Sequence, residues 1–163
     1  MDTELLKLVD ESRKLELYVS DIYMIFYKAF PEDSVFWWKL VLEEKHHAAL
    51  IKSIENADLS SYFFSEDILE SLVQVLFRTN NKLISLINEY NQNPPSRESA
   101  FNMAIELEKS AGEYHFQLVM EKSSETTAMK IFHELNADNK NHLKKIQAYM
   151  VNNGIEVDIS KKN

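Results

Sequence analysis

Residues 37–54 of the chain read WWKLVLEEKHHAALIKSI, and apolar residues recur in them at steps of three and four. This spacing places side chains on one face of an α-helix. The polar residues Glu44 and His47 stand in the same seam, near its middle. The full seam consists of Trp37, Leu40, Glu44, His47, Ile51 and Ile54. The stretch therefore predicts a core-facing helix that carries an acid and an imidazole inward.

Three further stretches repeat this pattern of an apolar seam that polar residues interrupt near its middle. They span residues 5–30, 101–118 and 132–149, and their inward polar residues include Glu16, Glu108, Asn139 and His142. No lysine or arginine stands in any of the four seams. A buried acid is strongly destabilising unless it is paired or bound to a cation. The pattern therefore predicts a metal ion inside a helical bundle.

Composition narrows the class of protein. The 163 residues, with 45% apolar and 27% charged residues, suit one globular domain with a sizeable core. Only two glycines occur, which excludes a phosphate-binding glycine loop and a dinucleotide fingerprint. The chain has no cysteine, which excludes disulfides, thiolate zinc sites and iron–sulfur clusters.

Charge and hydropathy indicate which kinds of binding partner to expect. The net charge is −8, and no basic cluster occurs beyond Lys144–Lys145 and Lys161–Lys162, so we expect no nucleic-acid partner. Residues 1–14 lack the apolar centre of a signal peptide. No apolar run approaches the roughly 20 residues that span a bilayer. We therefore expect no membrane partner and a cytoplasmic location.

The first two helices form a predicted hairpin. Thr3 can cap a helix that runs to Phe30, and Pro31 ends it because proline biases the preceding residue away from the α conformation. The turn at residues 31–34 is short. A short connection makes the second helix, which runs to about Asn56, an antiparallel neighbour of the first.

Residues 57–95 are predicted to form a crossover connection with helices of its own, because the segment is long enough to travel the length of a bundle. Its apolar stripe consists of Leu69, Leu72, Val73, Leu76 and Phe77. We expect Thr79–Asn81 to interrupt or kink this helix. The second hairpin then follows, with one helix from Ser96 to about Lys122 and another that ends near Asn152, where Gly154 can adopt the left-handed closing conformation.

Together these residues resemble the ferritin-like superfamily, and within it the rubrerythrin-like group. The resemblance covers residues 5–149 and rests on Glu16 with Tyr23 seven residues later, and on the runs Leu42–Ala48, Ala104–Lys109 and Leu135–His142. Di-iron carboxylate bundles take one Glu from each of two helices and Glu-x-x-His from each of the other two. Glu44 and His47 match the second of these motifs.

The resemblance implies an all-α, ferritin-like four-helix bundle over residues 1–154, followed by a tail at residues 155–163. In this fold two antiparallel hairpins are joined by the long 57–95 crossover. The resemblance also implies iron as the cofactor, with two ions bridged by carboxylates. The implied metal ligands are Glu16, Glu44, His47, Glu108 and His142.

Activities of this family include peroxide reduction, ferroxidation and oxygen activation. The resemblance therefore implies a di-iron oxidoreductase of peroxidase or ferroxidase type that acts on oxygen or peroxide. A linked rubredoxin domain is absent because the chain has no cysteine, so a separate protein would donate the electrons. The aromatic residues around Trp37 and Trp38 suit either the core or a homodimer surface.

Two positions depart from the family pattern. Asn139 stands where a metal-binding Glu is expected, and a neutral amide is a poorer ligand for Fe(II). Asp138 is adjacent but points about 100° away around the helix, so we do not expect it to substitute. Rubrerythrin peroxidases also carry an extra acid on the third helix, whereas Ile105 and Ala111 flank Glu108 here.

Two alternatives stay open for the site. It can bind a single Fe, Mn or Zn ion without turnover, since carboxylate and imidazole ligands suit several metals. The chain can also be a metal-free helical scaffold whose interior polar residues form hydrogen bonds with one another.

The resemblance also implies roles for residues around the predicted ligands. Tyr23 is expected to donate a hydrogen bond to a metal-bound carboxylate of a neighbouring helix. His115 is a second candidate donor or a displaced ligand, and Glu43 and His46 are expected to be exposed.

Overall fold

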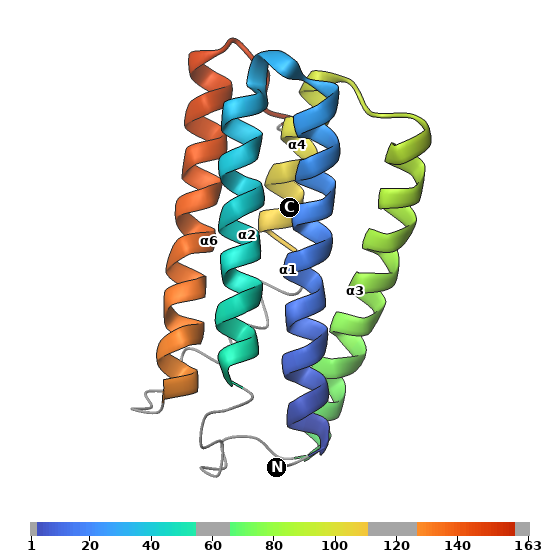
Figure 1. The fold of residues 1–163 in the computed structure, drawn as a ribbon, viewed down its shortest axis with the longest axis vertical. Coiled ribbons are helices and arrows are strands. Elements are labelled where there is room, and N and C mark those ends of the chain that lie inside the picture. Colours follow the sequence, from blue (N-terminus) through green and yellow to red (C-terminus); the bar gives the residue numbers. More distant parts are fainter. Residues whose placement is uncertain (1–2, 55–65, 111–126, 159–163) are drawn as a thin grey trace.

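The fold is described by a computed structural model for residues 3–54, 66–110 and 127–158, and every regular element in these ranges is helical (Figure 1). The elements are α1 (Thr3–Ala29), the 3₁₀ turn η1 (Pro31–Asp33), α2 (Ser34–Ser53), α3 (Glu66–Gln92), α4 (Arg97–Glu108) and α6 (Thr127–Asn152). The all-α prediction is thus confirmed for the described residues. None of the described helices has both the length and the apolar composition to cross a membrane.

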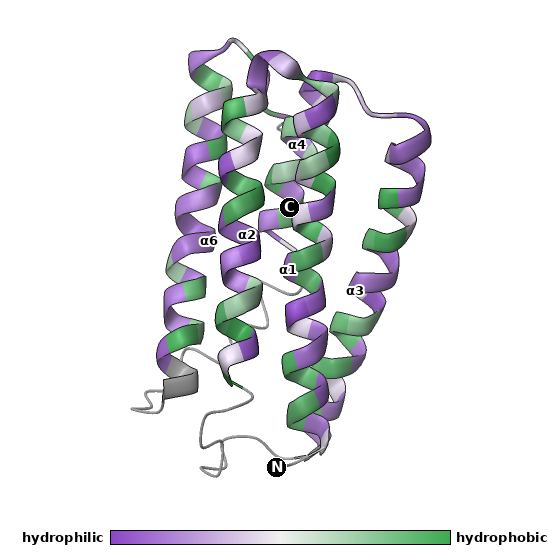
Figure 2. Cartoon of the chain, in the orientation of Figure 1, coloured by the Kyte–Doolittle hydropathy of each residue, from purple (hydrophilic) through white to green (hydrophobic). Residues whose placement is uncertain are grey.

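The five helices pack together in a way that is compatible with a four-helix bundle. Helix α1 packs along α2 and α3, α4 packs along α6, and α2 meets α6 (Figure 1). Helices α1, α2, α4 and α6 therefore surround a common interior, and α3 lies along α1. Figure 2 shows a hydrophilic band across the middle of α2, between apolar segments above and below it.

The first hairpin forms as predicted, and its turn is fixed by a buried acid. Helix α1 ends at Ala29, and Pro31 begins η1. The Asp33 carboxylate is buried and accepts two hydrogen bonds of 2.7 Å from Arg97 and one of 2.9 Å from the Tyr149 hydroxyl. This network ties the turn to α4 and α6, which fixes the hairpin against the rest of the bundle.

Aromatic side chains fill the bundle interior between this turn and the predicted site. The ring centroids of Trp37 and Phe101 lie 4.4 Å apart, and those of Phe26 and Trp37 lie 5.0 Å apart. Phe36 and Tyr149 stack at 4.1 Å. These close ring pairs join α1, α2, α4 and α6 in one packed layer, which holds the four helices in place next to the predicted site.

Helix α3 corrects part of one prediction, because Thr79–Asn81, expected to interrupt or kink the helix, does not interrupt it. Asn80 is buried, and its side-chain amide donates to the Glu11 backbone carbonyl at 3.0 Å and to the Glu11 carboxylate at 2.8 Å. Helix α1 thus accepts both hydrogen bonds of the Asn80 amide nitrogen, so this polar residue is accommodated within a continuous helix. Of the predicted apolar stripe, Leu69, Leu72 and Leu76 are buried, whereas Phe77 is 55% exposed.

Helix α4 also differs from its prediction. The Ser96 hydroxyl caps it as expected by accepting from the Ser99 amide at 3.2 Å, but the helix ends at Glu108 instead of reaching Lys122. A turn at residues 109–110 follows. The rest of the predicted helix, the turn after it and His115 lie outside the described residues.

The end of α6 confirms the predicted cap. Gly154 has a φ of +66°, and the Ile155 amide donates to the Met150 carbonyl at 2.9 Å, which closes the helix. Ile155, the first residue of the predicted tail, is buried. The chain therefore continues to pack against the core for a short distance beyond the helix.

Candidate metal centre

All five predicted ligands meet in the interior of the bundle. Each is at most 5% exposed, and they come from four different helices. Glu16 lies on α1, Glu44 and His47 lie on α2, Glu108 is the last residue of α4, and His142 lies on α6. The four separate seams thus bring their polar residues to one place.

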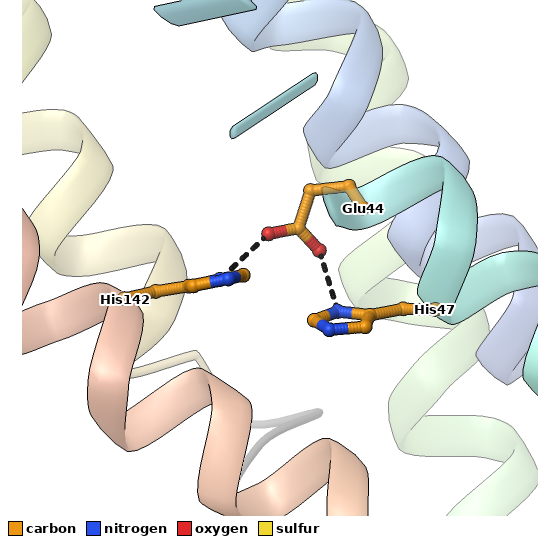
Figure 3. Close-up of side chains that lie close together, drawn as sticks. All are labelled: Glu44, His47 and His142. Atoms are coloured by element: carbon orange, nitrogen blue, oxygen red, sulfur yellow. Dashed lines mark hydrogen bonds and ion pairs between the residues drawn. The ribbon is translucent and has the colours of Figure 1, made fainter. Parts of the chain in front are cut away.

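Glu44 lies between the two histidines. Its Oε2 is 3.2 Å from His47 Nδ1, and its Oε1 is 3.0 Å from His142 Nδ1 (Figure 3). The two imidazole rings stack with centroids 5.2 Å apart. One ligand atom from each of the three residues can be chosen so that all lie within 4.8 Å of one another. This group could therefore hold a metal ion.

The other two glutamates flank this group, one on each side. Glu16 Oε2 is 3.5 Å from His47 Nδ1, and Glu108 Oε1 is 3.6 Å from His142 Nδ1. Each imidazole therefore faces the central carboxylate and one flanking carboxylate. Tyr23 of α1 donates a 2.7 Å hydrogen bond to Glu108 Oε1, which confirms the predicted contact with a carboxylate of a neighbouring helix.

Two buried atoms in the group have no hydrogen bond. Glu44 Oε1 and His142 Nδ1 lie 3.0 Å apart, but the contact lacks the angles of a hydrogen bond. His142 Nδ1 has one further ion-pair contact, with Glu108 Oε1 at 3.6 Å. An unsatisfied buried polar atom is destabilising by about 1–3 kcal/mol. A cation that accepts a lone pair from each atom would satisfy both, so the donor set fits a metal ion.

The carboxylates of the group titrate differently from free acids. Burial raises the pKa of Glu16 to about 8, although His47 opposes the shift. Burial also raises the pKa of Glu108, despite its contacts with His142 and Tyr23. The pKa of Glu44 is lowered, because the two histidines outweigh the effect of burial. Glu44 is therefore the carboxylate that stays ionised over the widest pH range.

The histidines are held in their charged form. Burial alone would lower the pKa of His47, but Glu16 and Glu44 raise it to about 11. In the same way, Glu108 and Glu44 outweigh burial and raise the pKa of His142 to about 10. Without a metal ion, protons on the imidazoles balance the buried carboxylates. A metal ion would have to displace these protons, since it binds the neutral imidazole.

Asn139 lies in the site, as its position in the seam predicts. It is buried and lines a cavity of about 20 Å³ together with Glu16, Glu44, Glu108 and Ser110. This volume holds one particle of about the size of a water molecule. Asn139 therefore lies beside the carboxylates of Glu16, Glu44 and Glu108.

The structure adds two carboxylates that the sequence did not identify as part of the site. Glu43 was expected to be exposed, but its Oε2 is buried and lies 3.0 Å from His142 Nε2. Asp138 does not face the central group, and its Oδ2 lies 3.5 Å from His47 Nε2. Each stands four residues before a histidine of its own helix but contacts the histidine of the other helix, so the spacing in the sequence did not indicate these contacts. His46 is exposed, as predicted.

Comparisons with known proteins do not identify a family for the chain. No family model, no characterised protein and no solved structure matches it. Function therefore has to be inferred from the residues and geometry of the site.

Proposed function

We propose that this chain is a metal-binding protein whose ion is bound by Glu44, His47 and His142. The observation that carries the proposal is the convergence of these three buried side chains, whose ligand atoms lie within 4.8 Å of one another. Carboxylate and imidazole are ligands that suit Fe, Mn and Zn. The flanking Glu16 and Glu108 supply further oxygen atoms close to both histidines.

We further propose that the centre is a di-iron site of a rubrerythrin-like, ferritin-like oxidoreductase. The pairing of each histidine with Glu44 and one flanking glutamate supports this reading, since it provides ligands for two ions that share Glu44. Two bound irons would supply two electrons together to oxygen or peroxide. Tyr23 orients Glu108 by its hydrogen bond. A separate donor protein would return the electrons.

A second candidate function is the binding of a single Fe, Mn or Zn ion without turnover. Asn139 favours this function, because it replaces the acid that would complete a second ion's ligands. The described residues also contain one group that satisfies the geometric requirement for a metal, Glu44 with His47 and His142.

A third candidate is a metal-free scaffold. The raised pKa values of His47 and His142 favour it, because imidazolium groups already balance the charges of the surrounding carboxylates. This candidate differs from the other two in one measurable way. Metal binding to the protonated cluster would release protons, and a scaffold would release none.

Anaerobic loading with Fe(II), followed by counting of bound iron per chain, tests the proposal. Two irons, with an oxo-bridge absorption after exposure to air, support the di-iron oxidoreductase. One ion without reaction with oxygen supports the single-metal function. His47→Ala should abolish binding, and His46→Ala, an exposed neighbour on α2, should not. Absence of binding by the wild-type chain would contradict both metal proposals.

A further inference from the structure

The outer nitrogen atoms of the two histidines contact carboxylates in a crossed arrangement. Helix α2 carries His47 and Glu43, and helix α6 carries His142 and Asp138. Glu43 of α2 meets Nε2 of His142 at 3.0 Å, and Asp138 of α6 meets Nε2 of His47 at 3.5 Å. Each helix therefore supplies a histidine to the centre and a carboxylate behind the other helix's histidine.

We propose that Glu43 and Asp138 are positioning residues of the metal centre, which hold the Nε2–H groups of His142 and His47 so that both rings present Nδ1 to the ion. This inference rests on the proposed metal-binding function. A neutral imidazole carries one ring proton, and the group that meets one nitrogen decides which nitrogen is left to bind a metal. An outer carboxylate keeps the proton on Nε2 and leaves the Nδ1 lone pair for the ion.

The contacts divide cleanly between the two ring nitrogens. In the described part of the chain, the carboxylates of Glu16, Glu44 and Glu108 meet the rings at Nδ1, and Nε2 meets only the outer carboxylates at ion-pair distance. The Nδ1 atom of each ring thus faces Glu44 and one flanking carboxylate, and the Nε2 atom faces away from them. Contacts of this kind are often long or poorly aligned before the ligand binds, and they tighten when it does.

Glu43 is itself held in place. Lys145 donates a 2.8 Å hydrogen bond to Glu43 Oε1. The buried Oε2 makes no hydrogen bond and lies 3.0 Å from His142 Nε2 as an ion-pair contact. The Glu43 side chain is 37% exposed and that of Asp138 is 41% exposed. Because the contact made by Glu43 is shorter and its Oε2 is buried, we expect Glu43 to have the larger effect on metal binding.

An ordinary ion pair between α2 and α6 is the competing explanation for Glu43. Such a pair would involve Lys145, which lies on the surface, and exposed ion pairs contribute little to stability. The two explanations predict different effects of Lys145→Met. A positioning role through His142 requires Glu43 but tolerates the loss of Lys145, whereas an interhelical ion pair requires both residues equally.

Zinc affinity, measured by competition with a chromophoric chelator, tests the inference. Glu43→Gln should weaken Zn²⁺ binding by about 10- to 100-fold, which is the usual effect of removing an outer-shell partner. Asp138→Asn should weaken it less, Asp138→Glu should restore most of the affinity, and Lys145→Met should have a smaller effect than Glu43→Gln. Glu134→Gln, which removes an exposed carboxylate from the same helix α6, should bind Zn²⁺ as the wild type does.

Nitrogen-15 NMR of the histidine rings supplies a readout that a purely structural role would not change. In the zinc-loaded wild type, His47 and His142 should both carry a proton on Nε2 and bind zinc through Nδ1. In Glu43→Gln, the His142 ring should lose this single form and populate the other tautomer. Circular dichroism of the metal-free variants, with Asp138→Asn as the more exposed and milder change, verifies that they fold.

The outcomes separate this inference from the proposed function. If the wild type binds zinc but Glu43→Gln and Asp138→Asn keep the wild-type affinity and ring signals, the positioning role is wrong and the metal centre stands. Equal losses in Glu43→Gln and Lys145→Met, with unchanged ring signals, would also overturn the positioning role. If the wild type binds no zinc, the metal proposal fails, and the positioning role fails with it.

Discussion

In the part of the chain that the structure describes, acids are buried in two places, and their surroundings differ. At the turn between α1 and α2, Asp33 accepts three hydrogen bonds, two from Arg97 and one from Tyr149. In the middle of the bundle, Glu16, Glu44 and Glu108 surround two histidines. There a Glu44 oxygen and a His142 nitrogen have no hydrogen bond. Both carboxylate oxygens of Asp33 are hydrogen-bonded, whereas the second cluster contains buried polar atoms that are in ion-pair contact but make no hydrogen bond.

The same contrast is visible in how the acids titrate. Burial acts against ionisation of Asp33, but the hydrogen bonds from Arg97 and Tyr149 lower its pKa below the usual value. Burial raises the pKa of Glu16 to about 8, and protons on the histidines balance the remaining charge. A buried acid with a fixed cationic partner is structural. A buried group of acids and imidazoles that only protons balance is able to exchange those protons for a metal ion.

The largest expected effect is the loss of metal affinity in Glu44→Gln. Glu44 is the carboxylate that both histidines share, so its removal takes a ligand from the centre and leaves an amide between two imidazoles. We expect Zn²⁺ affinity to fall by at least about 100-fold, or about 2.7 kcal/mol. Isothermal titration calorimetry measures the change. The variant Glu32→Gln, at an exposed acid beside the other cluster, should keep wild-type affinity.

The next largest effect is the loss of stability in Asp33→Asn. An amide cannot accept from both Arg97 nitrogens as a carboxylate does, and breaking a buried ion pair from one side is destabilising. Since Arg97 is 34% exposed, we expect a reduced loss of about 2–3 kcal/mol. Urea unfolding of the metal-free protein measures it. Zinc binding at the second cluster should stay intact in this variant, and a large loss of zinc affinity would mean that the two clusters are not independent.

Asp33 and the two histidines of the second cluster should respond to pH in opposite directions. The lowered pKa of Asp33 contributes stability above the ordinary pKa of 3.8, and this contribution is lost as the pH falls through the pKa of the folded protein. The raised pKa values of His47 and His142 contribute stability that is fully present below 6.5 and is lost as the pH rises through about 10 to 11. The raised pKa of Glu16 adds a further loss of stability as the pH rises from 4.5 to about 8.

Unfolding free energies of the metal-free protein across neutral and alkaline pH test this prediction. They should fall as the pH rises, by an amount on the order of 1 kcal/mol for each pH unit. Saturating zinc should remove the alkaline decline, because the ion replaces the protons. Asp33→Asn should keep that decline and lose only the part of the acidic decline that Asp33 contributes, since the lowered pKa of Glu44 contributes to it as well. A metal-free protein whose stability rises between neutral and alkaline pH would contradict the protonated cluster.

Periodicity predicted the buried site residues well because burial on a helix depends on local spacing. Glu16, Glu44, Glu108 and His142 occupy seam positions, and each is buried. Periodicity could not predict that both rings would face inward through Nδ1. Nor could it place Glu43 behind His142, since that contact depends on how α2 and α6 are rotated against each other.

Contacts between residues distant in sequence explain the remaining misses. Asp33 stands in a short polar turn, and no prediction was made for it, because its partner Arg97 lies 64 positions later. Asn80 was expected to interrupt or kink its helix, and its partner, Glu11, lies 69 positions earlier. In both cases the local sequence does not contain the partner of the polar residue.

The smallest expected effect is a gain in Fe(II) affinity when a further acid is added to the second cluster. Asn139→Glu adds a carboxylate beside the small cavity that Glu16, Glu44 and Glu108 line. If Asn139 is what leaves the centre one acid short, a second equivalent of Fe(II) should bind about tenfold more tightly, a gain of about 1.4 kcal/mol. Asn139→Leu adds similar bulk without an oxygen and should leave the second equivalent weak. Unchanged iron stoichiometry in Asn139→Glu would mean that α6 does not present this position to the metal, and that the resemblance of residues 135–142 to the family motif is misaligned.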